Sequence, residues 1–310
     1  MPDDMIRRHG PATARHPLML DSPHSGRFCP ADFDAAVDQA ALRDGEDCFI
    51  DALWLPATER GVPLLAAQFS RTYIDPNRHA GDIDLDLVDG GAWPVQGAGA
   101  WQPSGKAGIG KALVWRLLDD GRPIYDRRLS VAELQNRIAV HHRPYHAALR
   151  ALLDAAHAQF GVAYHLNGHS MNPVSGLLGN ADGSGAGRPR ADMVLGDRDG
   201  TTCAPSFTTF VREALPGMGY RVAVNHLFKG VELVRAFAEP AGDRHSLQFE
   251  VNKLLSMDLA TRQPHAGFAR LQADLMRLVD GVCGRFAPGQ QAAGPPRVTA
   301  PPSRPSTSAA

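Results

Sequence analysis

Two apolar runs of this chain end in a small-residue turn that carries a histidine. Residues 17–22 lead into SPHSG, which contains His24, and a later run leads into LNGHSM, which contains His169. A third stretch alternates apolar and polar residues over 246–252 and contains Glu250. Short apolar runs bounded by turn residues predict buried strands. Functional groups of α/β proteins lie at such strand ends, so these segments predict one site assembled from distant parts of the chain.

The order of strand-like and helix-like segments predicts the fold class. Apolar residues recur at helical spacing over 47–60, and an apolar strand-like run follows. A long helix is predicted over 131–159, with Ser130 and Glu133 as a capping box at its start and a break at Pro144. Strands that alternate with helices favour an α/β fold with a mainly parallel sheet.

Three segments lack the apolar periodicity of a core element. Residues 1–15 are polar and are predicted to form a flexible arm. Residues 287–310 are rich in Pro, Ala and Ser and are predicted to be disordered. The Gly- and Asp-rich residues 79–112 predict a long loop over the site. The folded domain is therefore expected to span residues 16–286.

Charge and composition exclude several classes of function. The formal net charge of −1 gives no reason to expect a nucleic acid or an anionic membrane as partner. No run of about 18 apolar residues is present, so no membrane span is expected, and the first residues lack the apolar core of a signal peptide. The four cysteines form no CxxC pair, which favours a reducing cytoplasm. The expected partner is a small molecule, and the oligomeric state is left open.

Two histidines and one carboxylate at strand ends are typical of a metal hydrolase. Neutral imidazoles bind the metal in such enzymes, and a carboxylate activates water. Glu250, inside an apolar strand, is either paired structurally or held as a base with a raised pKa. His24 could instead be a turn histidine bonded to backbone. A serine nucleophile beside either histidine is disfavoured, because neither serine lies in a GxSxG turn.

Two further segments need an assignment. The segment SRTYIDPNR contains Arg71, Asn77 and Arg78 after a predicted strand, and guanidinium groups hold a carboxylate bidentately. A surface ion-pair cluster is the alternative for this segment. The segment RPYH, which contains Arg143 and Tyr145, marks the break in the long helix, and a capped kink without further function is its alternative.

Taken together, these motifs resemble the N-formylglutamate amidohydrolase (N-formylglutamate deformylase) family. They occur in the order SPHSG, Asp47 ahead of IDAL, SRTYIDPNR, RPYH, LNGHSM, VLGDRDGTTC and LQFEVN, and the match covers roughly residues 17–275. The family is similar in fold to zinc carboxypeptidases and aspartoacylases. The resemblance therefore implies a single three-layer α/β/α domain, zinc-carboxypeptidase-like, with a mixed, mostly parallel central sheet.

The resemblance also implies one divalent metal, usually zinc, and a role for each matching residue. The metal ligands are matched by His24, Asp47 and His169, with Glu46 as the alternative acidic ligand. Glu250 matches the general base. The residue that polarises the scissile carbonyl is matched by Arg71. Substrate binding is assigned to Asn77 and Arg78, which match the pair that grips the substrate's carboxylate, and to Arg143 and Tyr145.

The implied reaction is hydrolysis of N-formyl-L-glutamate to formate and L-glutamate, a step of histidine breakdown, by attack of metal-activated water. The chain departs from the family pattern at Asn167, where Asp is usual, and at His226, where a small acidic residue is expected. Asn167 can still accept a hydrogen bond from His169 and orient its ring. Two alternatives stay open: a related metallohydrolase that acts on another N-acyl amino acid or a C-terminal peptide residue, and a metal-free protein that binds acidic metabolites through Arg71 and Arg78.

Overall fold

A twisted seven-stranded sheet forms the centre of the computed structural model, which describes residues 5–94, 104–174, 187 and 189–287. The strand order is β1-β3-β2-β4-β7-β5-β6. Strands β3, β2, β4 and β7 run parallel, whereas β1 pairs antiparallel with β3 and β5 pairs antiparallel with β7. The strands are β1 (Ile6–His9), β2 (Leu18–Ser22), β3 (Leu64–Ala67), β4 (Ala163–Met171), β5 (Met193–Gly196), β6 (Val222–Val224) and β7 (Arg244–Asn252).

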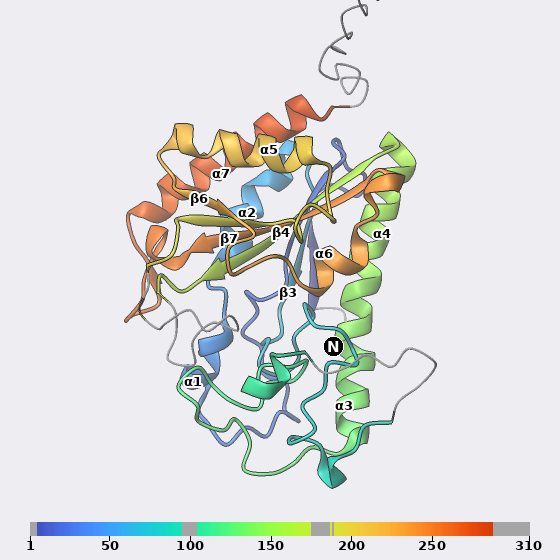
Figure 1. The fold of residues 1–310 in the computed structure, drawn as a ribbon, viewed down its shortest axis with the longest axis vertical. Helices are drawn as coiled ribbons and strands as arrows, with labels where there is room; N and C mark the ends of the chain where they lie inside the picture. Colours follow the sequence, from blue (N-terminus) through green and yellow to red (C-terminus); the bar gives the residue numbers. More distant parts are fainter. Residues whose placement is uncertain (1–4, 95–103, 175–186, 188, 288–310) are drawn as a thin grey trace, which may run out of the picture.

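Helices cover both faces of this sheet (Figure 1). The first layer contains α2 (Ile50–Trp54), α5 (Pro205–Ala214) and α7 (Gly267–Arg285). The second layer contains α3 (Val131–Arg137), α4 (Arg143–Phe160) and α6 (Glu232–Phe237). A short helix, α1 (Gln39–Leu42), and a small hairpin of β8 (Met257–Asp258) and β9 (Gln263–Pro264) complete the elements. The three layers around a mixed, mostly parallel sheet confirm the predicted α/β/α fold, and its likeness to zinc carboxypeptidases stays a prediction.

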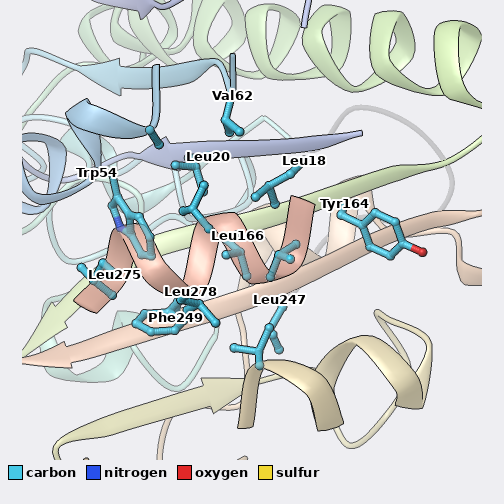
Figure 2. Packing of buried hydrophobic residues seen from close by; sticks show 14 of the residues in the cluster. Leu18, Leu20, Trp54, Val62, Tyr164, Leu166, Leu247, Phe249, Leu275 and Leu278 are labelled. Atoms are coloured by element: carbon cyan, nitrogen blue, oxygen red, sulfur yellow. The ribbon is translucent and has the colours of Figure 1, made fainter. Parts of the chain in front are cut away.

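The two faces of the central strands differ in polarity. Side chains alternate between the faces along a strand. Figure 2 shows the apolar face, where Leu166 of β4 and Phe249 of β7 lie with Leu275 of α7 in one buried cluster. Trp54 of α2 meets Phe249 edge to face, with 5.4 Å between the ring centres. The opposite face of β4, toward α4, presents polar residues instead, and these lead to the site described below.

The long helix predicted over residues 131–159 is present, with a change of helix type in its middle. The side chain of Ser130 accepts from the Glu133 backbone, and the Glu133 carboxylate accepts from the Ser130 backbone, so the capping box is confirmed. Residues Ile138–His142 form a π-helical turn directly before Pro144, which lies in the first turn of α4. The Arg143 N–H donates to the Ile138 carbonyl oxygen, so the change of helix type lies next to the proline that has no N–H to donate.

The flexible arm predicted for residues 1–15 is wrong over Ile6–His9, which form β1. This strand pairs in antiparallel register with β3, from Ile6 opposite Ala67 to His9 opposite Leu64. The polarity of the segment does not prevent this, because β1 lies at the edge of the sheet and leaves Arg7 and Arg8 exposed. An edge strand covers the backbone groups of β3 without burying its own polar side chains.

The remaining organisation follows the sequence patterns where it is described. Residues 79–112 contain only two 3₁₀ turns, Asp89–Gly91 and Ala107–Ile109, among their described positions. Residues 95–103 and the predicted tail from 288 onward lie outside the described residues. None of the described helices combines the length and the apolar character needed to cross a bilayer.

Replacing Ser130 by alanine should test the capping box. The change removes the acceptor of the Glu133 backbone N–H, so we expect Ser130→Ala to lower the free energy of unfolding by about 1 kcal/mol. Denaturant titration followed by circular dichroism measures this difference. The control is Ser206→Ala on the exposed side of α5, which should change stability by less than about 0.5 kcal/mol. Equal effects of the two substitutions would contradict a capping role.

Candidate active site

The carboxyl ends of the four parallel strands bring distant segments to one edge of the sheet. His24 lies two residues beyond the end of β2, and His169 lies near the end of β4. Glu250 of β7 is paired in register with His169. Residues 70–78, the SRTYIDPNR segment, follow β3. Parallel neighbours end at the same edge, so the three groups predicted from strand ends lie close together.

Close backbone approach at two glycines shapes this edge. A Cβ on Gly168 would lie 2.7 Å from Nε1 of Trp54 and 2.9 Å from the backbone oxygen of Asp21. A Cβ on Gly26 would lie 2.2 Å from the carbonyl carbon of Gln68. Only glycine fits such contacts. The turn that carries His24 therefore rests directly on the chain after β3, and the segment before His169 rests on β2 and α2.

Two imidazoles and one carboxylate converge at the bottom of the site. Nδ1 of His24 lies 3.1 Å from Nδ1 of His169, and Oδ2 of Asp47 lies 3.1 and 3.0 Å from these two atoms. All three side chains are buried. The backbone N–H of Asp47 donates to the carbonyl oxygen of His24 across 3.0 Å, which ties the acidic residue to the histidine turn.

The outer nitrogens of both rings contact side chains that accept hydrogen bonds. Nε2 of His24 lies 2.7 Å from Oδ1 of Asp75, and Nε2 of His169 lies 2.7 Å from Oδ1 of Asn167. A proton on each Nε2 leaves the Nδ1 lone pairs facing each other and Asp47, an arrangement that a cation between them would stabilise. A point about 1 Å above the centre of this triangle is about 2 Å from all three atoms, the distance of zinc to nitrogen and oxygen ligands. The His24, Asp47 and His169 group therefore could hold a metal ion.

Asp47, rather than Glu46, faces the two histidines. The carboxylate of Glu46 accepts from Nε of Arg27 and from Nε of Arg43, each across 2.6 Å. These bonds turn it away from the site. Burial raises the pKa of Asp47, but the contacts with His169 and His24 and the charge of Arg71 outweigh burial and hold this pKa well below its usual range. Of the two acidic candidates that the sequence left open, the structure brings Asp47 to the two histidines.

Glu250 is a buried carboxyl group beside this cluster. Nε2 of Gln248 donates to its Oε1 across 2.9 Å, and its Oε2 has no hydrogen-bond partner among the described residues. Burial and the negative charge of Asp47 raise the pKa of Glu250 to about 8. A carboxyl group with a raised pKa and a free oxygen at a cavity is suited to accept and return a proton near neutral pH.

A cavity of about 410 Å³ opens above these groups, and arginine and lysine side chains outnumber the carboxylates in its walls. Arg71 is held by Asp75, with 3.0 Å between Nη2 and Oδ2, and its guanidinium lies over the ring of Trp115. Arg78 is buried and donates to the carbonyl oxygens of Lys111 and Asn77. The basic residues that line the cavity are Arg71, Arg78, Lys106, Lys111, Arg190, Lys229 and Lys253. A cavity of this size and charge fits a small anion with more than one carboxylate.

The structure does not bring all predicted substrate-binding residues to the cavity. Arg143 is exposed on the outer side of α4 and does not line the cavity, so its assignment is corrected. Tyr145 is fully buried, and its hydroxyl donates to Oδ2 of Asp21 across 2.8 Å. It does not line the cavity, so its assignment to substrate binding is also corrected. Asn77 and Arg78 do line the cavity, and Nδ2 of Asn77 lies 3.1 Å from Nε2 of His169.

Several residues of the site had no role assigned from the sequence. Asp75 lies in the SRTYIDPNR segment and joins His24 to Arg71. A histidine that binds a metal usually donates its other ring N–H to a carboxylate or another acceptor, so a partner for His24 could have been sought among the nearby acidic residues. Lys106, Lys111 and Trp115 come from the loop region and the segment after it. Only the expectation that residues 79–112 cover the site pointed to them.

Comparisons with known proteins identify the family of the chain. A family model described as N-formylglutamate amidohydrolase matches residues 16–257. The chain belongs to the N-formylglutamate amidohydrolase family. This is a family of hydrolases that act on an amide bond.

Individual members of the N-formylglutamate amidohydrolase family resemble the chain over most of its length. The chain is 29% identical to an N-formylglutamate deformylase of Pseudomonas putida over 252 residues, which are 79% of this chain and 83% of the relative. The Pseudomonas aeruginosa enzyme of the same name is 28% identical over 250 residues, 79% of this chain and 83% of that relative. The crystal structure of an N-formylglutamate amidohydrolase from Ralstonia eutropha JMP134 is 44% identical, with a TM-score of 0.82, and covers 91% of this chain and 98% of its own. An Agrobacterium tumefaciens protein, 16% identical with a TM-score of 0.57 over 90% of this chain and 96% of its own, shares the fold.

Adding a methyl group at Gly168 should disturb the sheet beneath the site. The Cβ would meet the Asp21 backbone, which cannot move without shifting β2, so we expect Gly168→Ala to lower the free energy of unfolding by about 1–3 kcal/mol. Thermal and denaturant unfolding measure the loss. Gly217→Ala is the control, because a Cβ there meets no atom within 4 Å. If Gly168→Ala were as stable as Gly217→Ala, the close approach would not constrain this strand.

Proposed function

We propose that this chain hydrolyses N-formyl-L-glutamate to formate and L-glutamate with the help of one divalent metal, zinc, and that the reaction serves histidine breakdown. The observation that carries the proposal is the convergence of three ligand atoms, from His24, Asp47 and His169, beside the free carboxyl oxygen of Glu250. The names of the family and of its members supply the substrate. A pure anion binder, the metal-free alternative, needs neither the ligand cluster nor a base.

The proposed metal would be held by Nδ1 of His24, Nδ1 of His169 and Oδ2 of Asp47. A metal bound there would act as a Lewis acid and would lower the pKa of a bound water to about 7. Asp75 and Asn167 hold the two rings through their Nε2 atoms and thereby fix the direction of the Nδ1 lone pairs. Zinc suits two nitrogen ligands and one oxygen ligand with an open position, although other divalent ions accept the same ligands.

Glu250 is proposed as the group that moves protons. Its Oε2 accepts a proton from the attacking water and delivers it to the nitrogen of the leaving glutamate. Gln248 holds the other oxygen, so the carboxyl group keeps one orientation through both steps. A positive charge bound next to Asp47 would offset that residue's effect on the pKa of Glu250 and favour its ionised form.

Two arginines are proposed to bind the substrate's negative charges. Arg71 faces the ligand cluster, with 3.8 Å between its Nη1 and Oδ1 of Asp47, and stabilises the negative oxygen that develops on the formyl carbon. Asp75 keeps its guanidinium in place. The forked guanidinium of Arg78 binds a carboxylate of the glutamate portion. Asn77 holds the segment that carries both arginines, residues 70–78, against α6. The Leu233 N–H donates to Oδ1 of Asn77 across 2.9 Å.

The decisive experiment measures formate release from N-formyl-L-glutamate by protein stripped of metal and then reloaded with zinc. We expect activity only after reloading. A panel of N-formylaspartate, N-acetylglutamate, N-succinylglutamate and a glutamate-terminated dipeptide separates the proposal from the related metallohydrolases. A higher kcat/KM for any of these than for N-formyl-L-glutamate would overturn the substrate assignment. Binding of the compounds without hydrolysis and with less than about a tenth of a zinc per chain would support the metal-free alternative.

Removing the acid function of Glu250 should abolish most of the turnover. We expect Glu250→Gln to lower kcat by at least about 100-fold, the usual size of general base catalysis, while the zinc content per chain stays near that of the wild type. Steady-state kinetics and metal analysis on the same samples check both parts. Glu213→Gln, at an exposed position on α5, serves as the matched control. An unchanged kcat in Glu250→Gln would remove this residue from the mechanism.

A change of Arg78 to lysine should weaken substrate binding more than the chemical step. Lysine keeps the positive charge but cannot present two parallel N–H donors to a carboxylate. We expect Arg78→Lys to raise KM by about 10–100-fold, the value of one hydrogen bond to a charged group, with a smaller change in kcat. Arg221→Lys, on an exposed arginine that pairs with Asp192, is the control. A wild-type KM in Arg78→Lys would place the substrate carboxylate elsewhere in the cavity.

A further inference from the structure

A row of buried polar groups continues from the site into the interior, beneath α4. Nε2 of His169 lies 2.7 Å from Oδ1 of Asn167, and Nδ2 of Asn167 donates to Oδ1 of Asp21 across 2.7 Å. Asp21 and Asn167 are opposite each other in the parallel register of β2 and β4, and both have a relative exposure of 0%. Polar groups buried to this extent are satisfied by their neighbours.

Asp21 receives hydrogen bonds on both carboxylate oxygens. Oδ1 also lies 3.0 Å from Nε2 of His165, and Oδ2 accepts from the hydroxyl of Tyr145. Burial raises the pKa of Asp21, but the contacts with His165, Asn167 and Tyr145 outweigh it and lower the pKa. An ionised carboxylate can only accept. The nitrogen of the Asn167 amide must therefore face Asp21, which leaves its oxygen facing His169.

A second amide competes for the same ring nitrogen. The Leu233 N–H donates to Oδ1 of Asn77, so Nδ2 of Asn77 faces Nε2 of His169 at 3.1 Å. A bond donated by Asn77 would require the ring proton on Nδ1, and the ring could then not bind a metal through that atom. The shorter contact with the Asn167 oxygen requires the proton on Nε2 instead. The orientation of Asn167 therefore decides the state of His169.

We propose that Asp21 is a positioning residue of the candidate metal site: through Asn167 it holds the proton of His169 on Nε2 and leaves the lone pair of Nδ1 for the metal. The inference rests on the proposed metal-dependent function and deepens it. Asp21 touches neither the metal position nor the cavity. Tyr145, from the helix break singled out in the sequence, acts in the same network by holding the second oxygen of Asp21.

The ring state of His169 can be measured without any metal. In metal-free wild-type protein with ¹⁵N-labelled histidine, NMR spectra that correlate ring nitrogens with ring protons distinguish a proton on Nε2 from one on Nδ1. We expect Nε2–H in His169 of the wild type and a shift toward Nδ1–H in Asp21→Asn, because the Asn167 amide then loses its fixed direction. A wild-type His169 with its proton on Nδ1 would overturn the proposal, even if Asp21→Asn failed to fold.

Zinc affinity supplies the second measurement, by competition with a chromophoric chelator. We expect Asp21→Asn to bind zinc about 10–100-fold more weakly, as is usual when the partner of a metal-bound histidine is lost. In the double variant Asp21→Asn with Asn167→Asp, the new carboxylate accepts directly from His169, and we expect it to recover most of the lost affinity and the Nε2–H state. Rescue of this kind separates positioning from a general structural role.

Asp274→Asn is the matched control, because Asp274 is also a buried carboxylate that accepts from a tyrosine, Tyr220, but lies on α7 away from the site. It should leave zinc affinity unchanged. Wild-type affinity in Asp21→Asn, or a loss that the double variant does not restore, would overturn the proposal. A wild type that binds no zinc would instead contradict the proposed function, and the NMR experiment would still decide the role of Asp21.

Discussion

The parallel register of β2, β4 and β7 is the constraint on which the site depends. It places Asp21, Asn167 and Gln248 in one row across the sheet, and His169 and Glu250 in a neighbouring row. Because side chains alternate between the two faces, a slip of one residue would send the polar rows into the apolar core against α7. The buried cluster on that face, which includes Leu166 and Phe249, prevents the slip. The apolar core therefore determines the strand register, and the register determines which polar side chains meet at the site.

The edge of the sheet collects buried charges of both signs, which is costly unless each is compensated. Asp75 is compensated twice, by His24 and by Arg71. Asp47 and Glu250 share the positive charge of Arg71, and burial together with the negative charge of Asp47 raises the pKa of Glu250. The Asp47 carboxylate and two imidazole nitrogens converge on one point, and the buried carboxyl group of Glu250 lies beside them. A cation bound at this point would offset the charge of Asp47, and metal binding would then be coupled to the stability of this edge.

The sequence predicted the elements whose patterns are local and left open those that depend on tertiary direction. The strand that leads to His169 follows from its apolar run, and the strand that carries Glu250 follows from its alternation. The capping box at Ser130 follows from short-range bonding. Strand β1 has no apolar stripe, because an edge strand needs none. The roles of Arg143 and Tyr145 depended on which side of a π-helical turn each residue faces, and spacing around Pro144 does not determine that direction. Likewise, only Arg27 and Arg43 show that Glu46 turns away from the site.

The polar stripe of β4 is nevertheless present in the sequence, because His165, Asn167 and His169 recur at every second position of the strand. A neutral amide in the middle of this stripe has an electrostatic consequence. Asn167 passes on the orientation that Asp21 imposes, and the charge stays on β2, one strand farther from Glu250 than position 167 is. A carboxylate at position 167 would raise the pKa of Glu250 further and leave less of it ionised as a base. The amide thus separates two tasks, holding the histidine ring and tuning the charge around the base, that a single carboxylate would combine.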